Sequence, residues 1–343
     1  MAEHNASLKR QERESTDAEP SPKRSRPNES NTAGQEKPRH PTLWFDDGGI
    51  VLSAEHTLFR VHRSFLSLNS PIFRDLFSIP PRESASEDPE ETWEGLPLIR
   101  MHDDDEDIVN LLTALYDRTY SLASQPIDVV AGLLRMSTKY EIGYLRNQAI
   151  KYLTPIYDLP NRNIVERYTA TTRGVQFAPL IINTARETKT DFLIPGAFFF
   201  LAIQDINHIF ERITKEERPR YRISMDDLQT CITGREALIK CNRETIYSFG
   251  SKKCGENTRC NSRMNTFVQS EVWKEHVADP NTTAVLDSAF WNDITVCGMC
   301  VETHRMSSRM GVRKVIDQVP GYFKFSDWDT LRKSTKGQPS QIK

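Results

Sequence analysis

Apolar residues first alternate and then recur at helical spacing in the part of the chain that follows residue 41. The turn-forming run Asp46–Gly49 is flanked by apolar residues, and a second extended stretch follows at Thr57–Val61. Alternation around a turn is typical of paired strands, so the sequence predicts a β-hairpin here. The flanking apolar residues are Leu43, Phe45, Ile50 and Leu52.

Two helix starts follow the predicted hairpin. Ser64 can cap a first short helix, and Ser70 with Pro71 can start a second. A serine hydroxyl accepts from the free N–H groups of a first helical turn, where proline is also well tolerated. The spacing predicts that the second helix turns Phe73, Leu76 and Phe77 inward.

An acidic segment and an acidic helix start lie on either side of the next strand. Residues 78–95 are acidic and rich in Pro and Ser, which predicts an exposed loop before a short strand at Leu96–Met101. Asp103–Asp107 then places five acidic residues before a helical stretch, where each carboxylate opposes the helix dipole by roughly 0.3–1 kcal/mol when exposed. A calcium site is not favoured, because the five are consecutive and no spaced ligand loop surrounds them.

The rest of the chain has mainly helical periodicity. Helices are predicted at Asp128–Tyr140 and Gly143–Leu153, and 154–253 continues with apolar and charged stretches at helical spacing. The strongly apolar run Phe192–Ile203 is 12 residues long and contains a Pro-Gly pair. A bilayer-spanning helix needs roughly 20 apolar residues, so this run predicts a buried helix and no membrane partner.

Charge and composition narrow the function classes. The 343 residues carry 45 Lys and Arg against 47 Asp and Glu, a net charge of −2, which gives no support for a general affinity for nucleic acid. The first 15 residues lack an apolar stretch of signal-peptide length. We therefore expect an intracellular protein of the nucleus, the cytoplasm or both. The 6 cysteines are then thiols or metal ligands rather than disulfides.

Residues 1–41 have almost no large apolar side chain, which predicts a disordered tail. Its basic residues form two clusters with the spacing of a bipartite nuclear import signal, although an ordinary solvated basic tail explains them equally well. A phosphate on Ser21 would weaken such a signal through its negative charge. The clustered cations are Lys9, Arg10, Lys23, Arg24 and Arg26.

Three stretches together resemble the BTB/POZ domain, in the form found in mushroom-type fungal proteins. They are WFDDGGIVLSAEHTLFRVHRSFLSLNSPIFRDLF, LPLIRMHDDDEDIVNLLTALYDRTY and PIDVVAGLLRMSTKYEIGYLRNQAIKYL. The residues on the family's core positions are Phe59, Val61, His62, Leu66, Ser70, Phe73, Phe77, Leu133, Leu134, Tyr140 and Leu145. The resemblance covers residues 42–153 and implies an α+β domain, a small sheet flanked by helices.

The resemblance also implies a function in protein recognition. BTB domains form homodimers or heterodimers and recruit cullin-type ubiquitin ligases or transcriptional corepressors. His62 is a fold-defining residue in the family, and the absence of a neighbouring Ser or Cys nucleophile favours a structural, hydrogen-bonding role over catalysis. The chain has no kelch repeats and no tandem zinc fingers, so the usual substrate-binding or DNA-binding companion domain is missing.

Four cysteines in the last third of the chain form a candidate metal site. Cys254 and Cys260 are separated by five residues, and Cys297 and Cys300 by two. Two such pairs can supply the four sulfur ligands of a structural zinc, with His304 as a substitute ligand. Independent thiols are the alternative. A redox pair at Cys297 and Cys300 ranks last, because no βαβ pattern precedes it.

The C-terminal half resembles the same fungal proteins less specifically. They often end in a pattern C-x5-C, W, C-x2-C and LP-x-x-F-x-x-x-x-W, and here Val319 stands in place of its leucine. This resemblance supports the zinc prediction. The tryptophans Trp273, Trp291 and Trp328 are predicted to be packing residues, because burial best explains their large apolar area.

These patterns predict four parts: a tail at 1–41, a BTB/POZ domain at 42–153, a mainly α-helical domain at 154–331 and a tail at 332–343. The predicted function is BTB-mediated dimerisation and partner recruitment, as a ubiquitin-ligase adaptor or a transcriptional regulator. The alternative is a nuclear protein that contacts nucleic acid through a zinc-stabilised C-terminal segment, using cations such as Arg305, Arg309 and Arg313. An enzyme is not predicted, because the sequence has no phosphate-binding glycine loop, H-E-x-x-H or G-x-S-x-G motif.

Overall fold

The computed structural model describes most of the chain, and every statement below concerns the residues that it describes. From Pro38 onward the chain forms one compact unit. The predicted import signal, Ser21 and most of the acidic segment 78–95 lie outside the described residues. The described stretches are 37–78, 92–161, 174–214, 216–255, 258–281, 284–292 and 294–336.

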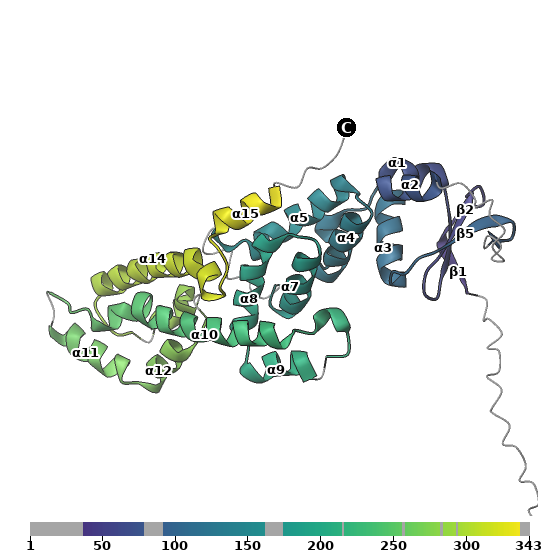
Figure 1. Cartoon of the computed structure of the whole chain (residues 1–343). Coiled ribbons are helices and arrows are strands. Elements are labelled where there is room, and N and C mark those ends of the chain that lie inside the picture. The colour runs from purple at the N-terminus through teal and green to yellow at the C-terminus, as the bar shows by residue number, and fades with distance from the viewer. Residues whose placement is uncertain are drawn as a thin grey trace, which may run out of the picture. The chain divides into compact units, whose positions relative to one another are not determined.

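Within the described residues, five strands form a small mixed sheet (Figure 1) in the order β1-β3-β2-β5-β4. Strand β2 pairs with β3, and β4 with β5, in antiparallel fashion. Strand β1 joins β3, and β5 joins β2, in parallel. The strands are β1 (Arg39–Trp44), β2 (Ile50–Ser53), β3 (Leu58–Val61), β4 (Thr92–Trp93) and β5 (Leu96–Arg100).

The predicted hairpin around the turn Asp46–Gly49 is wrong, although a hairpin does form one connection later, between β2 and β3. The turn Asp46–Gly49 joins β1 to β2, and these two strands are not neighbours, because β3 lies between them. A Cβ atom on Gly48 would approach Arg60 Cγ to 2.9 Å and the backbone of Val61 to 3.0 Å. Glycine is therefore needed here for the close approach of two segments rather than for a tight hairpin.

Helices cover the sheet and complete the N-terminal domain. The second predicted helix start is confirmed, because Ser70 Oγ accepts from the Phe73 N–H at 3.1 Å and donates to the Tyr140 carbonyl at 2.6 Å. The predicted cap at Ser64 is wrong, since the N-cap is His62, two residues earlier, and the helix begins at Arg63. The helices are α1 (Arg63–Asn69), α2 (Pro71–Ser78), α3 (Asp105–Tyr116), α4 (Ile127–Lys139) and α5 (Gly143–Tyr157), with a 3-10 turn η1 (Leu122–Ser124).

The acidic run before α3 does more than oppose a helix dipole. Asp104 is the N-cap and accepts from the Glu106 N–H at 2.9 Å, as a helix-start role requires. Asp105 instead accepts from the His56 N–H at 3.0 Å, which fixes the loop between β2 and β3. Asp103 accepts from Tyr140 Oη at 2.6 Å at the end of α4. The consecutive carboxylates therefore connect α3 to two other elements.

Asp107 carries the strongest of these connections. Its carboxylate is 10% exposed and pairs with Arg135 of α4, which is 6% exposed. It also accepts from Arg220 Nη1 at 2.7 Å, and Arg220 belongs to the 3-10 turn η5 (Pro219–Tyr221) beyond the N-terminal domain. One buried carboxylate thus joins α3, α4 and the C-terminal half.

The C-terminal half is mainly helical, as predicted. Among the described residues, no helix combines the length and apolarity needed to cross a membrane. Besides η5, its elements are η2 (Leu159–Asn161), η3 (Val175–Phe177), α7 (Ala178–Glu187), η4 (Asp191–Leu193), α8 (Ile194–Ala202), α9 (Ile206–Thr214), α10 (Met225–Thr245), η6 (Tyr247–Ser251), α11 (Thr258–Val268), α12 (Glu271–Ala278), η7 (Ala284–Leu286), α13 (Ser288–Asn292), α14 (Gly298–Tyr322) and α15 (Trp328–Lys336).

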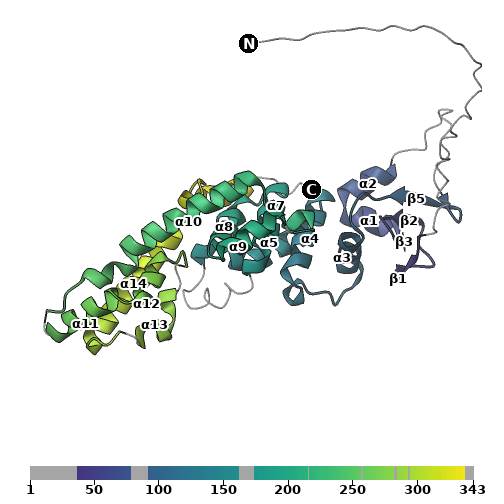
Figure 2. The same ribbon diagram turned by 90° about the horizontal axis from the view of Figure 1, so that it is seen from below.

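Helix α8 lies at the centre of this half, and all nine of its residues are buried, as predicted for the apolar run. It contacts α5, α7, α10 and α14, and Figure 2 shows α5 and α7 beside it. A Cβ atom on Gly196 would come within 1.9 Å of the Tyr157 carbonyl oxygen, so only glycine permits α8 to approach the end of α5 this closely.

The last helix returns to the N-terminal domain. Arg332 of α15 donates to both carboxylate oxygens of Asp158, at 2.6 and 2.9 Å, and Asp158 is 1% exposed. Helix α15 extends to Lys336, so the predicted start of a tail at residue 332 falls inside an ordered helix. The sequence signal was weak there because the helix is strongly polar and short.

Replacing Asp107 tests the buried connection. In Asp107→Ala, Arg135 loses its buried partner. The carboxylate that remains near it among the described residues is that of Glu187, which is largely exposed and lies 3.8 Å from Arg135 Nε. We expect the free energy of unfolding to fall by about 3–5 kcal/mol, measured by denaturant unfolding followed by circular dichroism. Arg220→Ala, which removes the half-exposed partner, should cost at most about 1 kcal/mol. Equal, small losses in both variants would contradict this account.

Candidate functional site

Helices α1 and α2 expose three large aliphatic side chains. Leu68, Ile72 and Leu76 have exposed fractions of 84%, 37% and 39%, and we call these residues the α1–α2 surface. Phe73 and Phe77 are buried, as predicted. The prediction that Leu76 points inward is wrong, because Phe73 and Phe77 occupy the inward face and Leu76 shares the neighbouring face with Ile72, four residues away.

His62 is a hydrogen-bonding residue at the junction of β3 and α1. Its Nδ1 lies 3.3 Å from Tyr116 Oη, and its Nε2 lies 3.0 Å from Asp47 Oδ1. The hydrogen bond with His62 lowers the pKa of Asp47. Both ring nitrogens therefore have protein partners, which agrees with the predicted structural role, although the ring is partly exposed at 28%.

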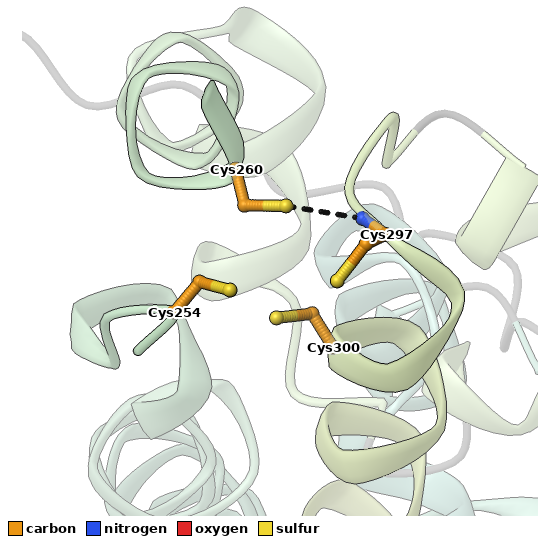
Figure 3. A group of neighbouring side chains, drawn as sticks. All are labelled: Cys254, Cys260, Cys297 and Cys300. Atoms are coloured by element: carbon orange, nitrogen blue, oxygen red, sulfur yellow. Dashed lines mark hydrogen bonds between the residues drawn. The ribbon is translucent and has the colours of Figure 1, made fainter. Parts of the chain in front are cut away.

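The four cysteines predicted as metal ligands lie together. Cys254 follows η6, Cys260 belongs to α11, Cys297 is the N-cap of α14 and Cys300 lies in the first turn of α14. Their sulfur atoms all lie within 4.8 Å of one another, and Figure 3 shows the four side chains directed toward a common centre. We call this group the cysteine cluster.

Hydrogen bonds hold the backbone around the cysteine cluster. The Cys297 N–H donates to Cys260 Sγ at 3.2 Å (Figure 3), which joins the start of α14 to α11. Asn261 accepts from the Cys254 N–H at 2.7 Å and donates to the Cys254 carbonyl at 3.3 Å. Arg263 donates to the Thr295 carbonyl at 2.9 Å. The sequence did not predict Asn261 and Arg263 as positioning residues, because the spacing of the cysteines indicates the ligands alone.

The thiols of the cluster differ in acidity. Hydrogen bonds from the backbone and side chain of Cys300 lower the pKa of Cys297, whereas burial raises the pKa of Cys300 to about 12. Neighbouring thiols donate to the Cys297 sulfur, which makes Cys297 more acidic than Cys300.

His304 lies outside the group of mutually close sulfur atoms. Its side chain is buried, and its ring stacks on Phe249 with 5.4 Å between centroids. Burial lowers the pKa of His304, which favours the uncharged form of the ring. The two remaining cysteines are also separate: Cys231 is fully buried in α10, and Cys241 accepts from Tyr322 Oη at 2.9 Å.

An aromatic core supports the part of the helical half that carries the cysteine cluster. Phe249 is fully buried, and its ring centroid lies 5.3 Å from Trp291 and 5.5 Å from Trp273. Trp291 and Trp328 are buried as predicted, while Trp273 is partly exposed. The aromatic residues that pack here are Tyr247, Phe249, Phe267, Trp273, Phe290 and Trp291.

Comparison with known proteins identifies the N-terminal domain. Residues 46–156 match the family model of the BTB/POZ domain, so this region of the chain is a BTB/POZ domain, a module for protein–protein interaction and dimerisation. No curated protein and no solved structure matches the chain. The mushroom-type fungal origin that the sequence resemblance implies therefore stays a prediction.

Truncating Phe249 tests the aromatic core. Phe249→Ala removes a fully buried ring, and we expect it to lower the free energy of unfolding of this region by about 3–5 kcal/mol. Tryptophan fluorescence during urea unfolding reports the change, because Trp273 and Trp291 contact the ring. Val272→Ala, at a position 42% exposed, should change the stability by about 0.5 kcal/mol or less. Indistinguishable transitions would mean that Phe249 is not central to packing.

Proposed function

We propose that the protein is a dimeric adaptor that pairs through its BTB domain and presents a bound protein partner. The observation that supports it is the α1–α2 surface of the detected BTB domain, where Leu68 is 84% exposed. A leucine this exposed contributes little to the fold of its own domain. A second copy of the chain is the occupant that a dimerisation module requires.

The α1–α2 surface suits a symmetric dimer. In a twofold interface the same patch appears on both copies, so the interface contains six aliphatic side chains, three from each copy. Fully burying an exposed leucine contributes roughly 1.5–3 kcal/mol, and Ile72 and Leu76, which are already more than half buried, contribute less. Together the side chains offset part of the entropy lost on association. The recruited partner protein would then bind other surfaces of the BTB domain or the helical half.

The BTB resemblance implies two classes of recruited partner, a cullin-type ubiquitin ligase and a transcriptional corepressor. Both fit an intracellular adaptor of the nucleus or the cytoplasm. Neither role needs catalytic residues in this chain, since an adaptor acts by holding two proteins close together. Linking two copies also strengthens partner binding, because the second contact forms at a high effective concentration.

The alternative of nucleic-acid contact through the C-terminal segment has less support. Arg305 of α14 pairs with Glu302 at 3.4 Å, and its guanidinium lies over the Trp291 ring at 5.8 Å. Met306 and Met310, both more than 60% exposed, interrupt the basic stretch of this helix. A helix face that follows a phosphate backbone is expected to present cations without apolar interruptions.

Charge on the α1–α2 surface tests the proposed dimer. We expect the wild-type chain to be a dimer by size-exclusion chromatography with light scattering, and Leu68→Arg with Leu76→Arg to be a monomer. Four like charges would face one another across the twofold axis and oppose association. Met225→Arg, at a position 67% exposed on α10, should leave the dimer intact. A monomeric wild-type chain at micromolar concentration would refute the proposed dimer.

Recruitment is tested by isolating the tagged full chain from its own cells and identifying co-purified proteins by mass spectrometry. We expect enrichment of a cullin or of a corepressor, at a lower level for the Leu68→Arg, Leu76→Arg variant because avidity is lost. The Met225→Arg chain should recover the wild-type amount. Absence of both partner classes from the wild-type sample would reject the adaptor role while leaving the dimer unaffected.

A further inference from the structure

We infer that the cysteine cluster binds one zinc ion as a closed structural site, with Cys254, Cys260, Cys297 and Cys300 as its four ligands. Two ligands come from the segment after η6 and from α11, and two come from the start of α14. The site would therefore connect parts of the helical half that are far apart in sequence, for example Cys260 and Cys297, which are 37 positions apart.

The arrangement of the sulfur atoms suits a single ion. A tetrahedral zinc site has Zn–S bonds of about 2.3 Å, which places its sulfur atoms about 3.8 Å apart. The four sulfur atoms lie within 4.8 Å of one another, so small side-chain rotations bring them to that separation. Figure 3 shows that they approach from opposite sides, as a tetrahedral ligand set does.

The chemistry of the ligand set favours zinc over the alternatives. Four thiolates in tetrahedral geometry are typical of zinc or iron–sulfur sites, whereas calcium and magnesium prefer oxygen ligands. A redox disulfide would need only two sulfur atoms, yet four converge here, and none of them forms a disulfide. Four protein ligands leave no open position for a substrate, which makes the site structural rather than catalytic.

Groups around the cluster would stabilise the charged site. Four thiolates and one zinc ion carry a net charge of −2, which hydrogen bonds and nearby cations can offset. The Cys297 N–H already donates to Cys260 Sγ at 3.2 Å, and Asn261 fixes the backbone of Cys254 on both sides. Lys253 and Arg259 immediately precede two of the cysteines in sequence and add positive charge.

The local fold explains why a metal would be needed. Helices α11, α12 and α13 have 11, 8 and 5 residues, lengths at which an isolated helix is marginal in water. Cys254 lies in a loop, and the N-cap of α14 makes no side-chain capping hydrogen bond. A zinc ion would hold the loop, α11 and the start of α14 together, and its binding energy would contribute directly to their folding.

Metal content and thiol state of the full chain test the inference. The chain is purified without a histidine tag, its metals are measured by mass spectrometry, and its free thiols are titrated after unfolding. We expect roughly one zinc ion per chain and six titratable thiols. Protein that carries iron, that lacks metal, or that contains a disulfide among the four cysteines overturns the inference.

Paired variants separate the site from the other cysteines. Cys297→Ser with Cys300→Ser should lose zinc, whereas Cys241→Ser, which alters a partly exposed cysteine outside the cluster, should retain it. Cobalt substituted into the wild-type chain should give the strong visible absorption of a tetrahedral thiolate site. Zinc retained by the double variant would assign the metal to other residues and overturn the inference.

Removing the metal from the wild-type chain tests the structural role even where a variant fails to fold. We expect a strong chelator to accelerate amide hydrogen exchange at least tenfold in α11, α13 and the first turns of α14, with no change in residues 46–156. The dimer, measured by light scattering, should persist. Unchanged exchange after complete loss of zinc would refute the structural role, and loss of the dimer alone would bear on the proposed function instead.

Discussion

A helix without a polar side chain must be covered on every side, and the arrangement of this protein follows from that requirement. Helix α8 is buried at all nine positions, so the elements that contact it form a closed shell around it. One of those elements is α5, the last helix of the BTB domain, and another is α14, which carries half of the cysteine cluster. The same apolar helix therefore joins the interaction domain to the part of the chain that carries the candidate metal site.

Much of this arrangement could be predicted from local patterns. The strand at Leu96, the helix start at Ser70 and the buried run from Phe192 depend on alternation, capping and uninterrupted apolarity, which neighbouring residues determine. The parallel pairing of β1 with β3 could not be predicted in this way, because it depends on how the chain returns after β2. The exposed position of Leu76 has a similar origin, since the choice between adjacent helix faces is made by tertiary packing.

The acidic run and the cysteines show both what local sequence patterns predict and what depends on residues far away in the sequence. Five consecutive carboxylates indicated a helix start, and Asp104 acts as one. That Asp107 is buried between two arginines depends on residues 28 and 113 positions away, and no local pattern contains them. The cysteines were predicted as two pairs. Their convergence, the exclusion of His304 and the positioning role of Asn261 follow from the folding of α11 against the start of α14.

The return of α15 to the end of α5 affects how the protein can be divided. The family match ends at residue 156, yet Tyr157 is fully buried, and the neighbouring Asp158 is 1% exposed and pairs with Arg332, 174 positions later. An excised BTB fragment that extends through Asp158 would bring an aromatic ring and a carboxylate into water at its new end. A chain cut before the last helix would leave that carboxylate buried without its cation. Recombinant fragments should therefore either stop before the final turn of α5 or continue through Lys336.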